Sequence, residues 1–177
     1  PLFGPGAEKI EGQGWVLTPT NSGEKKLAKQ IGSWLKKRGA KVYSMSPRQH
    51  DRLMSLTLAF PHFVGLATCD TLIRSGKFLQ AKRFAGPTYK LLLTLAEAVA
   101  SEDPNHYGSI QMNLPEAEAF QELFLARSKE WLDVVEKRDK PRFIRKMKHL
   151  KERLKKLDPD YSASYDAMYQ LLRKTSL

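Results

Sequence analysis

Cysteine is almost absent from this sequence of 177 residues, which contains only Cys69. One cysteine excludes an internal disulfide, and it fits a reducing cytoplasm in which Cys69 is a small core residue. The sequence also lacks the cysteine and histidine spacings of zinc sites, a P-loop and the Gly-x-Gly-x-x-Gly fingerprint of dinucleotide-binding folds. We therefore expect no metal site and no complete nucleotide-binding site within these residues.

Acidic residues are fewer than basic ones, with 19 Asp and Glu against 30 Lys and Arg, and the formal net charge is +11. Such a charge suits nucleic acid, an anionic membrane surface or a small anionic substrate, and it is equally compatible with solubility alone. The most basic segment, residues 139–157, is predicted to be a helix whose charges surround one apolar seam. It lacks exposed aromatic residues among those charges, which argues against nucleic acid.

A long membrane-spanning run is also missing. Residues 53–69 contain no Lys, Arg, Asp or Glu, but this stretch is shorter than the roughly 20 apolar residues that span a bilayer. The Ser-Pro-Arg-Gln sequence at 46–49 predicts a capped helix start just before it. Apolar residues fall on every face of this central helix, so we expect it to be buried in a soluble domain or in a dimer. Pro61 should kink it near Thr57.

Residues 1–45 predict a short α/β unit. Residues 1–14 are rich in glycine turns, residues 15–18 and 40–45 are predicted strands, and a helix capped by Asn21 runs between them to Gly39. Such a unit is too short to cover two sheet faces, so we interpret it as the trailing part of an α/β domain. The chain opens at Pro1 without Met, as expected for a fragment or a processed chain.

Residues 46–177 are predicted to be helical throughout, and the fold class is therefore mainly α. We expect residues 75–83 to form a polar connection between helices. Later helices are expected to start at cap-like residues, namely Gly86-Pro87, Asp103-Pro104, Asp139 and Asp158-Pro159. The apolar central helix has more apolar surface than one small subunit covers, which predicts a homodimer formed through it.

Histidine supplies the candidate functional residues that the pattern alone offers. His62 follows Pro61 on the apolar helix, where it is either a core histidine or a functional group at the kink. His50 and Asp51 lie in the first turn of the same helix. They are either surface and capping residues or part of a site at the mouth of the α/β unit, where such folds bind ligands.

Four segments, in one order, make the sequence recognisable. They are Pro1-Leu2-Phe3-Gly4-Pro5; Leu17-Thr18-Pro19; Met45-Ser46-Pro47-Arg48-Gln49-His50-Asp51 leading to Phe60-Pro61-His62-Phe63; and Phe84-Ala85-Gly86-Pro87-Thr88-Tyr89-Lys90 leading to Asp103-Pro104-Asn105-His106-Tyr107. With these segments, across residues 1 to about 150, the sequence resembles the prephenate dehydrogenase family. The resemblance implies a Rossmann remnant at 1–45 and a helical dimerisation and substrate-binding domain at 46–177.

The resemblance also implies a chemistry, the NAD- or NADP-dependent oxidative decarboxylation of prephenate or arogenate in tyrosine biosynthesis. His62 matches a family active-site histidine, Tyr107 an aromatic residue of the substrate pocket and Lys90 a basic family position. With His50, these are the expected substrate-binding residues. The family's catalytic histidine would lie just before Pro1, and the cofactor would be bound mainly by an upstream domain, so the 177 residues alone are expected to be inactive.

One position departs from the family pattern. The family's substrate-carboxylate arginine lies five residues before Asp103, where this sequence has Ala98, which offers no bidentate cation. Two alternatives therefore stand beside a cytoplasmic, homodimeric dehydrogenase acting on a small anionic substrate. One is a relative of the same fold with a changed substrate or a dimerisation or regulatory role. The other is a basic helical protein that binds nucleic acid.

Overall fold

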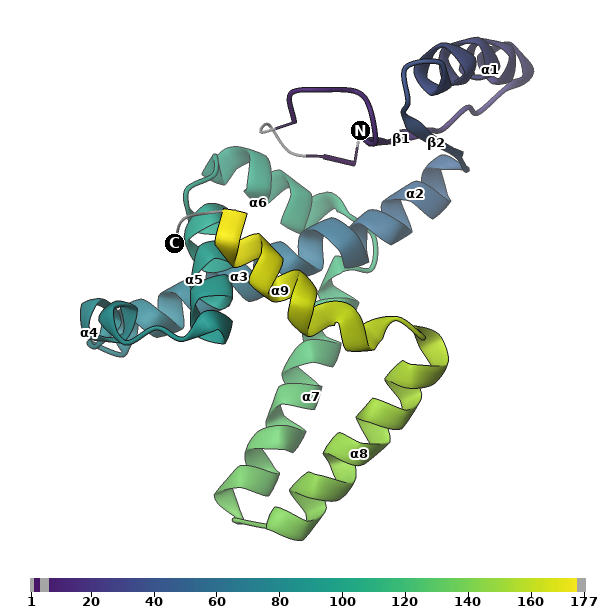
Figure 1. Ribbon diagram of the computed structural model, residues 1–177. Coiled ribbons are helices and arrows are strands. Elements are labelled where there is room, and N and C mark those ends of the chain that lie inside the picture. Colours follow the sequence, from purple (N-terminus) through teal and green to yellow (C-terminus); the bar gives the residue numbers. More distant parts are fainter. Residues whose placement is uncertain (1, 4–6, 175–177) are drawn as a thin grey trace.

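The computed structural model describes residues 2–3 and 7–174, and it is a mainly helical molecule with a small α/β unit at one end (Figure 1). Its elements, in chain order, are β1 (Gly14–Leu17), α1 (Ser22–Lys36), β2 (Lys41–Ser44), α2 (Pro47–Met54), the π-helix η1 (Ser55–Ala59), α3 (Phe60–Arg74), α4 (Phe78–Arg83), α5 (Pro87–Ala100), α6 (Pro104–Asn113), α7 (Ala117–Glu136), α8 (Lys140–Leu157), the 3-10 turn η2 (Tyr161–Ala163) and α9 (Ser164–Lys174). The predicted mainly α class is confirmed.

The α/β unit is a parallel two-stranded sheet whose strands are joined by α1. Leu17 of β1 pairs with Ser44 of β2. Gly32 of α1 packs against Leu17 and Val42, because a Cβ at Gly32 would lie 3.5 Å from both side chains. Strand side chains alternate between faces, so Val16 and Tyr43 are left on the face away from α1. That second face forms one wall of the cavity described below.

The central helix is continuous from Pro47 to Arg74, but five of its residues are π-helical. The predicted capping box is confirmed, since Ser46 and Gln49 bond each other's backbone N–H groups. In η1 the N–H of Phe60 donates to the carbonyl of Ser55, five residues back. Pro61 has no N–H to continue an α-helical ladder at this point, and a π-turn is one known response of a helix to such a break.

Hydrogen bonds to α6 and to the α6–α7 connection hold the π-helical segment in place. Gln111 of α6 donates to the Ala59 carbonyl at 2.9 Å, and Gln121 of α7 donates to Gln111 at 2.7 Å. The buried Ser55 hydroxyl contacts the carbonyls of Asp51 and Pro115. These contacts fix α6 along the central helix, and they matter because both elements line the cavity.

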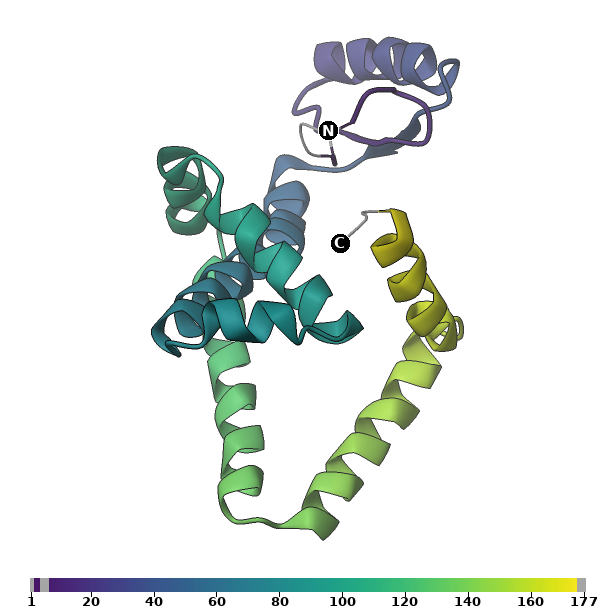
Figure 2. The same cartoon turned by 60° about the vertical axis from the view of Figure 1, so that its left-hand side comes forward.

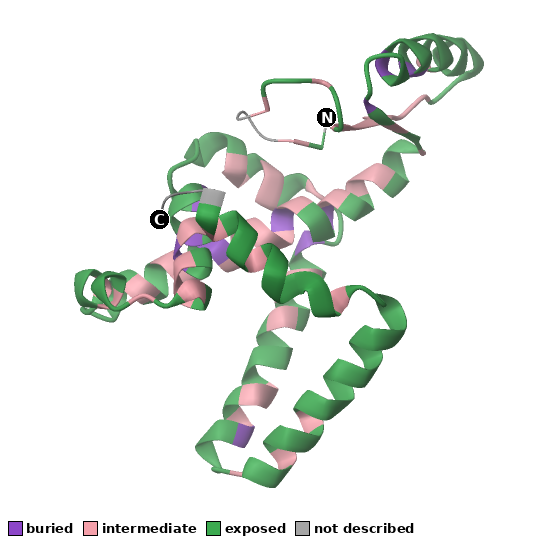
Figure 3. Cartoon of the chain, viewed as in Figure 1, coloured by how far each residue is buried: buried purple, intermediate pink, exposed green. Residues whose placement is uncertain are grey.

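The core of the helical part lies where α3 crosses α5. Gly65 allows the close approach, since a Cβ there would lie 3.0 Å from the Cγ2 of Val99. Leu93, Ala96 and Val99 of α5 are buried against this crossing. Purple segments in Figure 3 are few; one group lies near this crossing and others lie in α1 and near the end of α7, whereas most of the helical surface is exposed.

Helices α7 and α8 form a hairpin that projects from this core, and α9 follows the C-terminal end of α8, away from the hairpin turn, and contacts α5 (Figure 2). Asp133 of α7 bridges Lys137 and Arg142 across the turn, at 2.6 and 3.0 Å. The hydrogen bond and charge of Lys137, with help from Arg142, hold the pKa of Asp133 below its usual value. The charged turn thus fixes the hairpin, while Met147, Leu150 and Leu154 of α8 remain half-exposed.

Three sequence predictions need correction. Residues 78–83 form the short helix α4 instead of a polar connection. Gly76, with a positive φ, lies between the end of α3 and this new helix, which includes Leu79. The last helix begins at Ser164, after a 3-10 turn, instead of at Asp158-Pro159. The central helix is less buried than its composition indicated, since Leu66 is 41% exposed and Ile73 is 61% exposed within one chain.

By length and composition alone, Pro47–Arg74 is the one helix of the described residues that could cross a membrane. The core helix of a soluble protein passes the same test, so the observation carries little weight. In this structure the helix packs against α5, α6 and α7.

Candidate functional site

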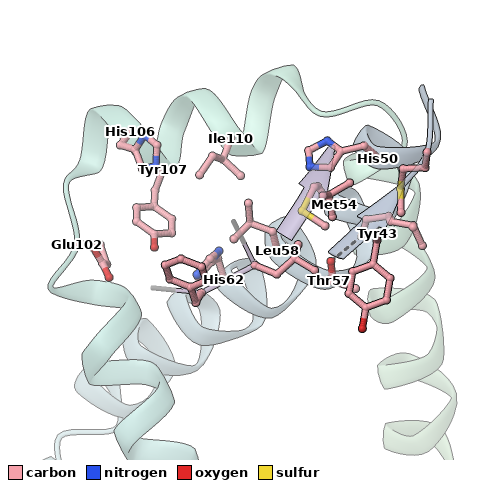
Figure 4. A pocket seen from close by; sticks show the side chains of 15 residues that line it. Tyr43, His50, Met54, Thr57, Leu58, His62, Glu102, His106, Tyr107 and Ile110 are labelled. Atoms are coloured by element: carbon pink, nitrogen blue, oxygen red, sulfur yellow. Dashed lines mark hydrogen bonds between the residues drawn. The ribbon is translucent and has the colours of Figure 1, made fainter. Parts of the chain in front are cut away.

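A cavity of about 840 Å³ lies between the α/β unit and the helical part. Its walls come from β1 and β2, from the central helix and from α6 (Figure 4). Its lining residues are Leu2, Phe3, Val16, Tyr43, Met45, His50, Leu53, Met54, Thr57, Leu58, His62, Glu102, His106, Tyr107 and Ile110. A large, mostly apolar cavity with a few convergent polar groups is typical of a small-molecule site.

His62 is the polar group most enclosed by apolar surroundings. Its ring lies edge-on to the ring of Tyr107, with centroids 4.4 Å apart. Its Nδ1 is buried and has no hydrogen-bond partner among the described residues. Burial lowers the pKa of His62, and the Leu58 carbonyl and the Glu102 carboxylate only partly oppose that effect. The imidazole is therefore neutral at pH 7 and can either donate or accept a hydrogen bond.

Glu102 and Tyr107 both face His62. Glu102 lies in the connection between α5 and α6, and Tyr107 lies in the first turn of α6. Burial raises the pKa of Tyr107, and the charge of Glu102 and a hydrogen bond to it raise it further. The Tyr107 hydroxyl therefore stays protonated and points toward the Glu102 carboxylate (Figure 4). Asp103 caps α6 by accepting from the N–H groups of Asn105 and His106, which fixes the turn that presents Tyr107.

His50 lines the other end of the cavity, close to β2. Its Nδ1 lies 2.9 Å from the Asp51 carboxylate, and both residues lie in the middle of α2. Tyr43 and Met45, at the carboxyl end of β2, line the cavity beside it. The structure therefore brings together three of the four predicted substrate-binding residues, namely His50, His62 and Tyr107.

Lys90, the fourth of these residues, does not line the cavity. It lies half-buried in the first turn of α5. Ala98, at the position where an arginine was expected, lies on the same helix and also does not line the cavity.

Sequence reasoning missed most of the lining residues as candidates, among them the polar residues Tyr43, Thr57, Glu102 and His106. The last two lie beside the Asp103-Pro104 cap, but a glutamate and a histidine at a helix start are ordinary, and only the fold places them at the cavity. Among the described lining residues, Glu102 is the only Asp, Glu, Lys or Arg.

Residues that could hold the phosphates of a nucleotide were not found in the α/β unit. The loop after β1 is Thr18-Pro19-Thr20, without glycine. The Asn21 side chain caps the N-terminus of α1, and the Glu24 carboxylate accepts from Thr20 at 2.6 Å. A carboxylate at this helix N-terminus opposes an anion there. The described residues thus do not fit a dinucleotide phosphate site.

Comparison with known proteins gives a consistent result. The family described as the prephenate dehydrogenase dimerization domain matches residues 46–149. A probable arogenate/prephenate dehydrogenase of Methanocaldococcus jannaschii is 29% identical over 150 residues, which are 84% of this chain and 34% of that protein. The T-protein of Enterobacter agglomerans is 27% identical over 147 residues, which are 81% of this chain and 38% of that protein. The chain thus spans about a third of the length of these curated relatives.

Solved structures share the fold. A prephenate dehydrogenase from A. aeolicus, crystallised with hydroxyphenyl propionate and NAD+, has a TM-score of 0.60 and 23% identity over 84% of this chain and 51% of its own. The Synechocystis arogenate dehydrogenase has a TM-score of 0.63 and 17% identity over 86% of this chain and 55% of its own. At these identities the likeness concerns the fold alone.

Proposed function

Because its residues 46–149 match the dimerization domain, this chain belongs to the prephenate dehydrogenase family, and we propose that it forms the substrate-binding and dimerisation part of such an enzyme. The proposed reaction oxidises a ring carbon that bears a hydroxyl and releases a ring carboxylate as CO2, with NAD or NADP as the acceptor. Support for the acceptor comes from the A. aeolicus relative, which was crystallised with NAD+. The proposed domain division places a Rossmann remnant at residues 1–45 and the helical domain at 46–177.

The observation that carries the proposal is the enclosed His62. Its imidazole lines the cavity beside Tyr107, and because the Leu58 carbonyl can engage only one of its two ring nitrogens, the ring is able to hydrogen-bond a ligand. The cavity around it is large enough for a single-ring substrate with two acidic groups.

Each lining residue has a proposed role that follows from its chemistry. Neutral His62 and the Tyr107 hydroxyl hydrogen-bond the polar groups of the ring, and His50, oriented by Asp51, does the same at the opposite end. Tyr43, Met54 and Leu58 exclude water from the ring faces. Lys90 is a more distant basic group on α5, and its proposed role as a point charge for a substrate carboxylate would need α5 to bring it closer to the cavity.

The described residues supply no phosphate site for the acceptor, which in the proposed enzyme is held mainly by a domain upstream of Pro1. Ala98 favours one alternative, a relative of the same fold whose substrate differs from prephenate. We extend the proposal to a cytoplasmic homodimer, since the matched family domain is described as a dimerization domain and one chain leaves much of its central helix exposed.

The proposal can be tested by following reduction of NAD and NADP with prephenate and with arogenate, using the protein at its native length. We expect turnover of at least one substrate by the wild type and a loss of about a hundredfold or more in kcat/KM for His62→Ala, as is usual for a polar group that binds the transition state. His149→Ala is the matched control, because His149 is an exposed histidine on α8, away from the cavity.

Absence of turnover with both substrates and both cofactors would contradict the proposed activity and favour a dimerisation or regulatory role. Equal activity of His62→Ala and wild type would instead contradict the proposed site, because the cavity would then not be where the ring is bound.

A further inference from the structure

The charge of the cavity does not match a substrate that is purely anionic. Among the described lining residues there is no Lys or Arg, and the one residue of fixed charge is Glu102. A carboxylate repels the keto-acid side chain of prephenate, which is purely anionic, whereas it attracts an ammonium group. Arogenate differs from prephenate by carrying an amino group in place of the side-chain keto group.

Glu102 is available for such a group. Glu97, one turn earlier on α5, is already neutralised by Lys82 at 2.9 Å. In the described part of the chain Glu102 forms no ion pair, and its neighbour is the Tyr107 hydroxyl, which is neutral. The carboxylate therefore has no cationic partner among the described residues, at the end of the cavity that His62 also lines (Figure 4).

The groups around Glu102 also supply the hydrogen-bond acceptors that an ammonium group needs. An ammonium group donates three hydrogen bonds and accepts none. The Glu102 carboxylate, the Tyr107 hydroxyl oxygen and an imidazole nitrogen of His62 are three acceptors at one end of the cavity. The Tyr107 ring adds a π face that attracts a cation.

Resting on the proposed function above, we propose that Glu102 is a specificity-determining residue that binds the ammonium group of an amino-acid substrate, so that this cavity selects arogenate over prephenate. Glu102 acts by binding the substrate, and the residue takes no proton in the reaction. Substitution by Gln keeps the shape and removes the charge, and because Glu102 is an exposed residue after the end of α5, the variant is expected to fold.

The test compares kcat/KM for arogenate and prephenate in the wild type, Glu102→Gln and Glu122→Gln, at the native length of the protein. Glu122 is an exposed residue of α7 outside the cavity, so its variant receives the same chemical change without the proposed effect. We expect wild type to prefer arogenate, and Glu102→Gln to lower the arogenate to prephenate ratio by about tenfold or more, the lower range for a hydrogen bond to a charged group. Glu122→Gln should leave the ratio unchanged.

A binding experiment separates the failure of this inference from the failure of the proposed function. Tyrosine and hydroxyphenyl propionate differ by one ammonium group, and their affinities can be compared by calorimetry. Tighter binding of tyrosine that disappears in Glu102→Gln supports the ammonium site even if no substrate is turned over.

Three outcomes would overturn the inference. They are a wild type that prefers prephenate, a substrate ratio unchanged in Glu102→Gln, and, if there is no turnover, equal affinity for the two ligands. The first two leave the dehydrogenase activity standing, whereas absence of turnover alone counts only against the proposed function.

Discussion

At the scale of single residues, the chemistry of the cavity depends on the protonation state of His62. The imidazole lies between Tyr107 and the apolar residues of the central helix, and burial is the main reason that its pKa is lowered. A neutral imidazole can serve as an acceptor for an ammonium or as a donor to a hydroxyl. A charged imidazolium could only donate, for example to a hydroxyl. The environment of His62, which sets its protonation state, therefore decides which groups of a substrate it binds.

The lowered pKa of His62 predicts that stability falls in weak acid. In the unfolded chain the imidazole takes up its proton near its ordinary pKa of 6.5, whereas the folded chain resists protonation until the pH reaches a lower value. The unfolded state therefore binds more protons in this window, and the free energy of unfolding decreases as the pH falls below 6.5. It levels off once the folded-state pKa is passed.

Urea unfolding at about pH 7.5 and about pH 5.5, at one protein concentration, measures this effect in wild type and His62→Gln. We expect the variant to lose part of the decrease in unfolding free energy between the two pH values. An identical decrease in both proteins would show that His62 is not protected from protonation. The prediction concerns folding alone, so it holds whatever the substrate is.

The sequence predicted part of the site residue by residue. His62 could be found because a histidine in an uncharged helix is rare, and His50 because it follows a capping box at a strand end. Glu102 could not be found in this way, since a glutamate before a helix cap is ordinary and only the packing of α6 on the central helix turns it toward the cavity. Lys90 stays a prediction, and the structure places it outside the cavity lining, because position along a helix does not tell which face borders a cavity.

At the scale of elements, the packing of α3 on α5 depends on Gly65. The missing side chain lets Val99 approach so closely that a Cβ would lie 3.0 Å from its Cγ2 and 3.1 Å from its Cβ. Gly108 in the middle of α6 is different, because nothing lies within 4 Å of the place where its Cβ would be. The same substitution to alanine at these two helical glycines therefore separates the effect of close packing from the effect of helix propensity.

Gly65→Ala is predicted to destabilise the protein by about 1–3 kcal/mol, because overpacking of a tight helix crossing outweighs the better helix propensity of alanine. Gly108→Ala is predicted to stabilise it by about 0.5–1 kcal/mol, since alanine restricts the unfolded chain and meets no obstacle. Chemical denaturation of both variants measures the two effects. Equal effects on stability would mean that α3 and α5 do not cross as closely as described.

The elements were more predictable from sequence than their packing. The capping box at Ser46 and the caps at Asn21, Asp103 and Asp139 are local signals, and all four are present in the structure. The π-helical turn before Pro61 was predicted only as a kink, because its form depends on contacts with other elements: Gln111 of α6 donates to the Ala59 carbonyl, and the Ser55 hydroxyl donates to the Pro115 carbonyl. Tertiary contacts of this kind leave no periodic pattern in the sequence.

At the scale of the whole molecule, one chain leaves too much apolar surface uncovered. Along the central helix Leu66 is 41% exposed, and along α8 the residues Leu150 and Leu154 are 51% and 46% exposed. Their spacing places Met147, Leu150 and Leu154 on one side of α8, opposite its many Lys and Arg side chains. Apolar surface arranged in this way is typical of an interface and explains how an apolar helix can be half-exposed in one chain.

We therefore expect a homodimer that covers both surfaces. Leu66→Glu and the pair Leu150→Glu with Leu154→Glu each place an unpaired charge in the expected interface, which should raise the dimer Kd by about a hundredfold or more. Lys148→Glu, which reverses one charge on the basic face of α8 away from the apolar seam, should leave the dimer intact. Sedimentation equilibrium of the variants measures the change. If only Leu66→Glu dissociates the dimer, the interface is confined to the central helix and the α8 seam serves another contact; if none does, the prediction of this interface is wrong.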